Sequence, residues 1–167
     1  VEECMSRNLY DFDRDLLQRN LPDLRVCGYE FTGAAYCVSS LGSSIKANMA
    51  LMEPKVRTQL FDASRPIYTK VRDDSPTRYG LGSVVSNSII ADGCLIEGEV
   101  ENCVLFRGVK VHKGAKLRNC VIMQDAVVGE NSRLDFVVAD KDTIFDPNRT
   151  LMGYQTYPVF VAKGSKV

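Results

Sequence analysis

The sequence lacks an excess of charge of either sign, a long hydrophobic run and a recognisable targeting segment. Its 21 basic and 21 acidic side chains cancel, so no basic surface favours nucleic acid and no polybasic segment favours an anionic membrane. No apolar stretch reaches the roughly 18 residues that a membrane-spanning helix needs, and the first residues show no signal-peptide pattern. The chain begins without Met, and we expect it to be the C-terminal part of a longer protein.

The sequence also lacks the paired ligands of a metal site. None of its cysteines forms a C-x-x-C pair, and the single histidine, His112, is not spaced from them as in a zinc site. The six cysteines are Cys4, Cys27, Cys37, Cys94, Cys103 and Cys120. We therefore expect reduced thiols in a cytoplasmic protein, with no metal and no cofactor bound by this chain.

What the second half of the chain does contain is a repeat. Four segments align, at residues 87–90, 102–105, 119–122 and 135–138, with starts 15, 17 and 16 residues apart. A shorter interval of six residues runs through them. It is marked by Ile90, Ile96, Leu105, Val111, Leu117, Ile122, Val128, Leu134, Val138 and Ile144. Asp, Asn and Gly lie between these positions, where a chain is expected to turn.

An interval of six residues excludes an α-helix, whose period is about 3.6, and favours a triangular coil with three short strands in each turn. The sequence therefore predicts a mainly β fold, a left-handed parallel β-helix of hexapeptide repeats over about 84–144. Ile90, Leu105, Ile122 and Val138 are expected to stack in one inward column. Three cysteines fall at small inward positions, which indicates packing rather than sulfur chemistry.

The first eighty residues do not share this repeat. We expect a helix to begin near Tyr10 and to end at Pro22, a strand over 24–31, and a helix over 41–52. The predicted organisation is an α/β remnant at 1–53, a linker at 54–82, and the β-helix at 83–167. The last part includes a strand at 159–161 that covers the end of the coils.

The order of these elements carries a family resemblance. GYEFTG, IKANMALM and RPIYTKVRDDSPTRYG, followed by the hexapeptide repeat, resemble the C-terminal part of bacterial ADP-glucose pyrophosphorylase (glucose-1-phosphate adenylyltransferase). That family makes ADP-glucose for glycogen synthesis from ATP and glucose 1-phosphate with Mg²⁺. The resemblance implies that residues 1–53 belong to a nucleotidyltransferase-like domain. It also implies that the β-helix serves subunit contacts and allosteric control.

Two departures from the family pattern concern catalysis. The Gly-rich segment that binds nucleotide is absent, and Cys37 stands where active members have a metal-binding Asp. Mg²⁺ prefers oxygen ligands, so we expect no catalytic residue and no enzyme activity in this chain alone. The departure resembles the GlgD-type regulatory, non-catalytic subunit. Activity of a longer protein is left open.

The resemblance also implies partners for this region. A catalytic ADP-glucose pyrophosphorylase subunit or a second copy would bind the coils, and a phosphorylated effector would face Lys141, Lys163 and Lys166. These lysines are equally explained as solubilising surface residues.

Two other functions remain open. Hexapeptide acyltransferases are trimers that often use His as a general base, but His112 follows an inward Val and is expected to point outward. The second alternative is a purely structural β-helix.

Overall fold

The computed structural model describes residues 6–69 and 72–167. The chain divides into two units, Val1–Gly33 and Ala34–Val167, and each is described by itself.

The described part of the first unit includes the short helical segments η1 (Phe12–Leu17) and η2 (Gln18–Asn20). The Asp11 side chain begins η1 by accepting a hydrogen bond of 2.8 Å from the Arg14 N–H, as expected of an N-cap. The strand predicted over 24–31 is wrong, because this segment forms no ladder with any described residue. Its apolar side chains, including those of Val26 and Phe31, are exposed.

The second unit begins with two helices, α2 (Leu41–Ala50) and α3 (Pro54–Leu60). Ser40 and Ser43 form a reciprocal cap at the start of α2: each accepts the backbone N–H of the other, at 3.2 and 2.9 Å. At the other end, Arg57 of α3 donates to the carbonyl oxygens of Leu51 and Met52. The expected linker at 54–82 therefore contains α3 and the first strand of the sheets described next.

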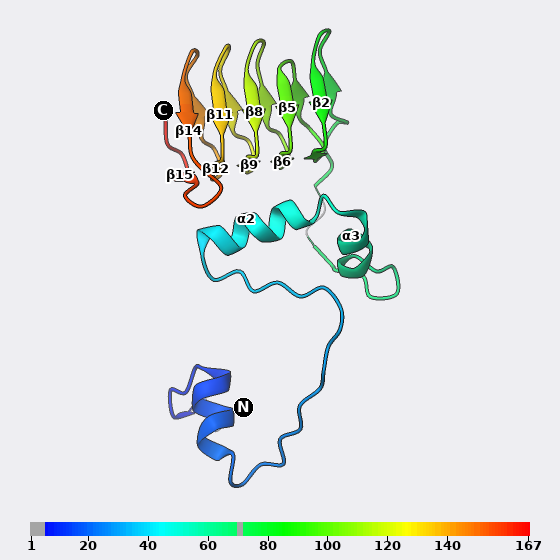
Figure 1. Cartoon of the computed structure of the whole chain (residues 1–167), viewed down its shortest axis with the longest axis vertical. Helices are drawn as coiled ribbons and strands as arrows, with labels where there is room; N and C mark the ends of the chain where they lie inside the picture. The colour runs from blue at the N-terminus through cyan, green and yellow to red at the C-terminus, as the bar shows by residue number, and fades with distance from the viewer. Residues whose placement is uncertain (1–5, 70–71) are drawn as a thin grey trace. The chain divides into compact units, whose positions relative to one another are not determined.

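Fifteen short strands form three five-stranded parallel sheets (Figure 1). Sheet A contains β1 (Arg78–Tyr79), β4 (Leu95–Ile96), β7 (Lys110–Val111), β10 (Val127–Val128) and β13 (Ile144–Phe145). Sheet B contains β2 (Val84–Ser86), β5 (Glu99–Glu101), β8 (Lys116–Arg118), β11 (Arg133–Asp135) and β14 (Thr150–Met152). Sheet C contains β3 (Ile89–Ile90), β6 (Val104–Leu105), β9 (Val121–Ile122), β12 (Val137–Ala139) and β15 (Val159–Val161). The chain visits the sheets in turn, so the predicted parallel β-helix is confirmed.

The core lies inside this three-sided prism. The aliphatic side chains that recur every six residues point inward, and most are 0 or 1% exposed. These are Ile96, Leu105, Val111, Leu117, Ile122, Val128 and Leu134. The predicted end strand is confirmed too, because β15 pairs with β12 in parallel.

The predicted inward column is wrong at its fourth member. Leu105 pairs with Ile122 as expected, but Ile122 pairs with Ala139 and not with Val138. The same shift leaves Ile144 44% exposed, while the next residue, Phe145, is 1% exposed. Because side chains alternate across a strand, an alignment error of one residue moves each side chain to the other face.

The source of the shift is the corner between sheets B and C. Asn119 turns this corner with φ 51°, and the residue that turns it one coil later is Phe136, with φ 50°. The alignment of the four repeat segments predicts Asp135 at this corner instead, because Asp and Asn adopt positive φ far more readily than Phe.

The other corners are turned by residues that tolerate positive φ. Between sheets C and A these are Gly93, Gly108, Asp125, Asp142 and Gly164, and between sheets A and B they are Gly82, Gly114, Asn131 and Asn148. The second coil has no positive-φ residue at the corner between sheets A and B. This shorter corner accounts for the interval of 15 residues between the repeat segments that begin at Asn87 and Asn102. Gly98 occupies the shortened corner, where an added Cβ would collide with the Ala115 carbonyl oxygen.

The register can be tested with two isoleucines of the same size. Replacing Ile122, which is fully buried, with Ala should lower the free energy of unfolding by about 2–5 kcal/mol, because a core cavity forms. Replacing the partly exposed Ile144 with Ala should lower it by about 0.5 kcal/mol, as at a surface site. Urea denaturation of both variants measures the difference. Equal losses would contradict the observed register and favour the sequence alignment.

Candidate functional site

An apolar stripe runs along the outer face of sheet C. It consists of Val104, Val121 and Val138, which follow one another on β6, β9 and β12 and are 5, 1 and 3% exposed. Helix α2 and the turn after it cover this stripe with Leu41, Ile45, Met49 and Met52. Their spacing of three or four residues places them on one face of the helix. Because a helix of ten residues is marginal alone in water, this packing is what holds α2.

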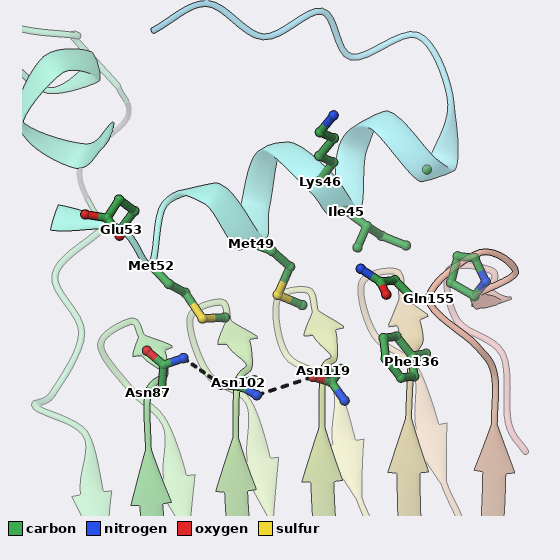
Figure 2. A pocket seen from close by; sticks show the side chains of 12 residues that line it. Ile45, Lys46, Met49, Met52, Glu53, Asn87, Asn102, Asn119, Phe136 and Gln155 are labelled. Carbon is green, nitrogen blue, oxygen red and sulfur yellow. Dashed lines mark hydrogen bonds between the residues drawn. The ribbon is translucent and has the colours of Figure 1, made fainter. Parts of the chain in front are cut away.

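A groove of about 850 Å³ lies between α2 and the corner that joins sheets B and C (Figure 2). The α2 wall is formed by Gly42, Ile45, Lys46, Met49, Met52 and Glu53. The opposite wall is formed by Asn87, Asn102, Asn119, Phe136, Gln155 and Pro158. One wall is thus mainly apolar, with one cation and one anion, and the other is mainly a row of side-chain amides.

The amide row is a ladder of hydrogen bonds along the coils (Figure 2). Asn87 Nδ2 donates to Asn102 Oδ1 at 2.6 Å, and Asn102 Nδ2 donates to Asn119 Oδ1 at 3.4 Å. Asn119 Nδ2 donates to Asp135 Oδ1 at 2.9 Å. A carboxamide has two N–H donors and two acceptor lone pairs, and the ladder uses at most one of each. Each Asn therefore retains capacity to bind a further group.

Phe136 continues the same corner column one coil beyond Asn119. A left-handed backbone costs an L-residue about 1–2 kcal/mol, and a bulky side chain has no local hydrogen bond that offsets this. The fold nevertheless places an aromatic ring at the end of the amide row, where three preceding coils place Asn.

An insertion in the last coil completes the groove. Where earlier coils turn through one residue, residues 153–158 form a loop between β14 and β15. Two main-chain hydrogen bonds between Tyr154 and Tyr157, of 3.1 and 2.9 Å, close it. Gln155 and Pro158 of this loop line the groove. The sequence does not predict this insertion, because residues 153–158 depart from the six-residue interval.

The three lysines predicted as effector ligands lie at or beside the corner between sheets C and A, away from the groove. Lys141 and Lys163 occupy the corner between sheets C and A on adjacent coils, where the Gly164 N–H donates to the Lys141 carbonyl oxygen at 2.9 Å. Lys163 Nζ lies 3.9 Å from Asp142 Oδ2. Lys166 pairs with β13 beside Ile144 and lies 3.3 Å from Asp146. All three are exposed, and their role as effector ligands stays a prediction.

Two other residues singled out in the sequence lie outside the groove. His112 Nδ1 is 3.5 Å from Glu97 Oε2 on the preceding coil, at the corner between sheets A and B. Cys37 is exposed in the extended segment before α2. Among residues 6–69 and 72–167, no three His, Cys, Asp or Glu side chains are grouped so that they could hold a metal ion.

The inward cysteines pack against backbone. The Cys120 N–H approaches Cys103 Sγ at 3.4 Å, and Cys120 Sγ donates to the Arg118 carbonyl oxygen at 2.9 Å. Burial raises the pKa of the Cys120 thiol well above its usual value, and the neighbouring Cys103 raises it further. Burial also raises the pKa of the Cys94 thiol. Cys4 lies outside the described residues.

These pKa directions predict the reactivity of each thiol. Because the thiolate is the nucleophile, a raised pKa and burial should both protect Cys94 and Cys120 in the native state. Buried Cys103 should be protected with them, while exposed Cys27 and Cys37 should react. Alkylation with iodoacetamide near neutral pH, read site by site by mass spectrometry, measures this, with urea-unfolded protein as the control. Rapid native alkylation of Cys120 would show that the coil opens.

Within the part of the chain that the structure describes, no helix has the length and apolar character needed to cross a membrane.

The triangular coils, the positive-φ corners and the covering helix define a hexapeptide-repeat β-helix protein. The profile of the family described as GlmU-like, C-terminal hexapeptide matches residues 70–156. The chain belongs to this family, and the predicted left-handed parallel β-helix agrees with it.

Curated relatives extend beyond the repeat. The chain is 41% identical over 155 residues to "Glycogen biosynthesis protein GlgD" of Bacillus subtilis, covering 93% of this chain and 45% of that protein. It is 44% identical over 119 residues to the protein of the same name from Geobacillus stearothermophilus, covering 71% and 35%. To a glucose-1-phosphate adenylyltransferase of Acetivibrio thermocellus it is 35% identical over 127 residues, covering 75% and 30%. The resemblance inferred from sequence is confirmed, and the chain spans less than half of each relative.

Proposed function

We propose that this chain is the subunit-contacting and regulatory region of a GlgD-type protein of glycogen biosynthesis in the cytoplasm. The observation that carries the proposal is its similarity to a GlgD protein over 93% of its length. The exposed thiol of Cys37, where active adenylyltransferases have a carboxylate, supports a role without catalysis. We assign the Mg²⁺ and nucleotide chemistry of ADP-glucose synthesis to a catalytic subunit and not to this chain.

The prism suits a contact role because its outer faces are regular and its core is closed. On sheet B, Lys116 lies 2.8 Å from Glu99, and Arg118 lies 3.1 Å from Glu101. These pairs hold the long side chains of two adjacent coils in order on one face. Exposed ion pairs contribute little to stability. We infer that these pairs instead provide charge complementarity to a partner. The partner would be a catalytic ADP-glucose pyrophosphorylase subunit or a second copy.

One observation favours the acyltransferase alternative. The Glu97 carboxylate lies close enough to His112 Nδ1 to orient the imidazole as a general base. However, the groove of the second unit lies at another corner of the prism, and neither residue lines it. The Glu97–His112 pair therefore could not act on a substrate bound in that groove, and we favour the regulatory role.

The absence of catalysis is testable on the chain itself. Incubated with ATP, glucose 1-phosphate and Mg²⁺, the purified chain should form no ADP-glucose, because the nucleotide-binding segment of the family is missing and Cys37 is a poor Mg²⁺ ligand. Cys37→Ala should behave identically, and an active adenylyltransferase serves as the positive control. Turnover that is lost in Cys37→Ala would overturn the non-catalytic assignment.

The regulatory role is testable by co-expression with a catalytic subunit. The GlgD-type protein that contains this chain should co-purify with that subunit and change its maximal rate or its response to a phosphorylated effector. If the predicted lysines bind the effector, Lys141→Ala combined with Lys163→Ala should weaken that response and leave co-purification intact. Lys113→Ala, at another exposed corner position, is the matched control.

Two results would count against this role. If the two proteins neither associate nor alter each other's kinetics, a purely structural β-helix becomes the better account. If Lys113→Ala weakens the response as much as the double variant, the lysines act by general charge and not as ligands.

A further inference from the structure

The groove between α2 and the Asn ladder has a chemistry that differs from a phosphate site. Its lining contains one cation, Lys46, and one anion, Glu53, so the two charges balance. The remaining polar lining groups are carboxamides, which are neutral and which both donate and accept hydrogen bonds. A ligand that matches them must be neutral and must carry groups that donate and accept as well. Hydroxyl groups meet this requirement.

The spacing of the amides points to a ligand that repeats. Asn87, Asn102 and Asn119 occupy equivalent corners of successive coils, and paired strands are separated by about 4.8 Å. An extended peptide presents like groups on one side about every 6.6 Å, twice the rise of about 3.3 Å per residue, so its groups would not match the spacing of the amides. A chain of sugar units offers hydroxyls at closer intervals along its length.

The aromatic ring supplies the second half of sugar recognition. Hydroxyls leave one face of a pyranose ring lined by C–H groups, which pack on the face of an aromatic side chain. Phe136 places such a ring at the end of the amide row, with Gln155 between it and Ile45 of α2, while Met49 points toward Asn119 (Figure 2). Phe136 has a positive φ, although Asn at this corner would adopt that backbone conformation with less strain. A binding role accounts for that choice.

We propose that this groove binds a linear α-1,4-linked glucose chain, with sugar hydroxyls on the Asn ladder and one ring on Phe136. The chemistry of the groove indicates a neutral oligosaccharide. The choice of α-linked glucose rests on the proposed function in glycogen biosynthesis. The site would let a protein of this class sense or hold the polymer for which ADP-glucose is made.

The direct test is a titration of the full chain with maltotetraose, followed by NMR of the side-chain amide groups. The signals of Asn87, Asn102 and Asn119 should shift saturably, and those of Asn131 and Asn148, at corners outside the groove, should not. Cellotetraose, which differs in linkage, should produce much smaller shifts. No saturable shift with maltotetraose, or shifts outside the groove only, would overturn the proposal. Binding of cellotetraose alone, or of an extended neutral peptide in its place, would overturn it as well.

Two variants separate binding from folding. Phe136→Asn should raise the midpoint of thermal unfolding, because Asn suits the positive φ, and should weaken maltotetraose binding by about tenfold. Asn102→Gly should weaken binding by a similar factor, about that of one hydrogen bond. Its control, Asn131→Gly, also changes a positive-φ corner and should bind normally.

Unchanged binding in both groove variants would contradict the assignment. A Phe136→Asn variant that loses stability and keeps its affinity would show that the ring only packs. Sugar binding does not require a partner subunit, so its failure would leave the co-purification test of the proposed function untouched.

Discussion

The structure depends on one backbone requirement: the chain must turn a sharp corner three times in each coil. All but one of the regular corners use a residue with positive φ, and the second coil uses Gly98 at a shortened one. Gly, Asn and Asp meet this requirement with the least strain. Where Asn does so on successive coils, its side chains stack on the outside and bond to one another. The feature that closes the prism therefore also builds the amide row of the groove.

The second surface of the groove has a different origin. Val104, Val121 and Val138 face outward, and burying them requires something to lie over sheet C. Helix α2 meets that need with Ile45 and Met49, and its reciprocal Ser cap fixes where the helix begins. The groove between α2 and the corner thus follows from two separate requirements of folding. Loss of either surface would remove the site without unfolding the inner core.

The inward side of the prism was predictable from sequence as far as Leu134, because a six-residue interval of aliphatics leaves few alternatives; beyond it Val138 and Ile144 were assigned inward wrongly. The outward side was not. Val104 and Val121 are next to inward residues in the sequence. Nothing in the sequence therefore indicated that α2, which begins some sixty residues earlier, packs on them. The corner at Phe136 was assigned wrongly, because the neighbouring Asp135 is of a type that adopts positive φ more readily. The strand expected over 24–31 failed because a strand needs a neighbour, and sequence alternation alone does not supply one. The groove is formed by α2, the Asn corners and the loop before β15, which lie far apart in the sequence, and so no single motif predicted it.

The groove exists only if α2 is held on the outer face of sheet C. Residue-resolved hydrogen exchange of the full chain tests it most directly. A free helix of this length exchanges quickly in water, whereas a packed one opens only when its contacts break. We expect strong protection from exchange for the amides in the last two turns of α2, together with those of β6, β9 and β12. Exchange of the α2 amides at the rate of an unstructured peptide, with the three strands still protected, would contradict it.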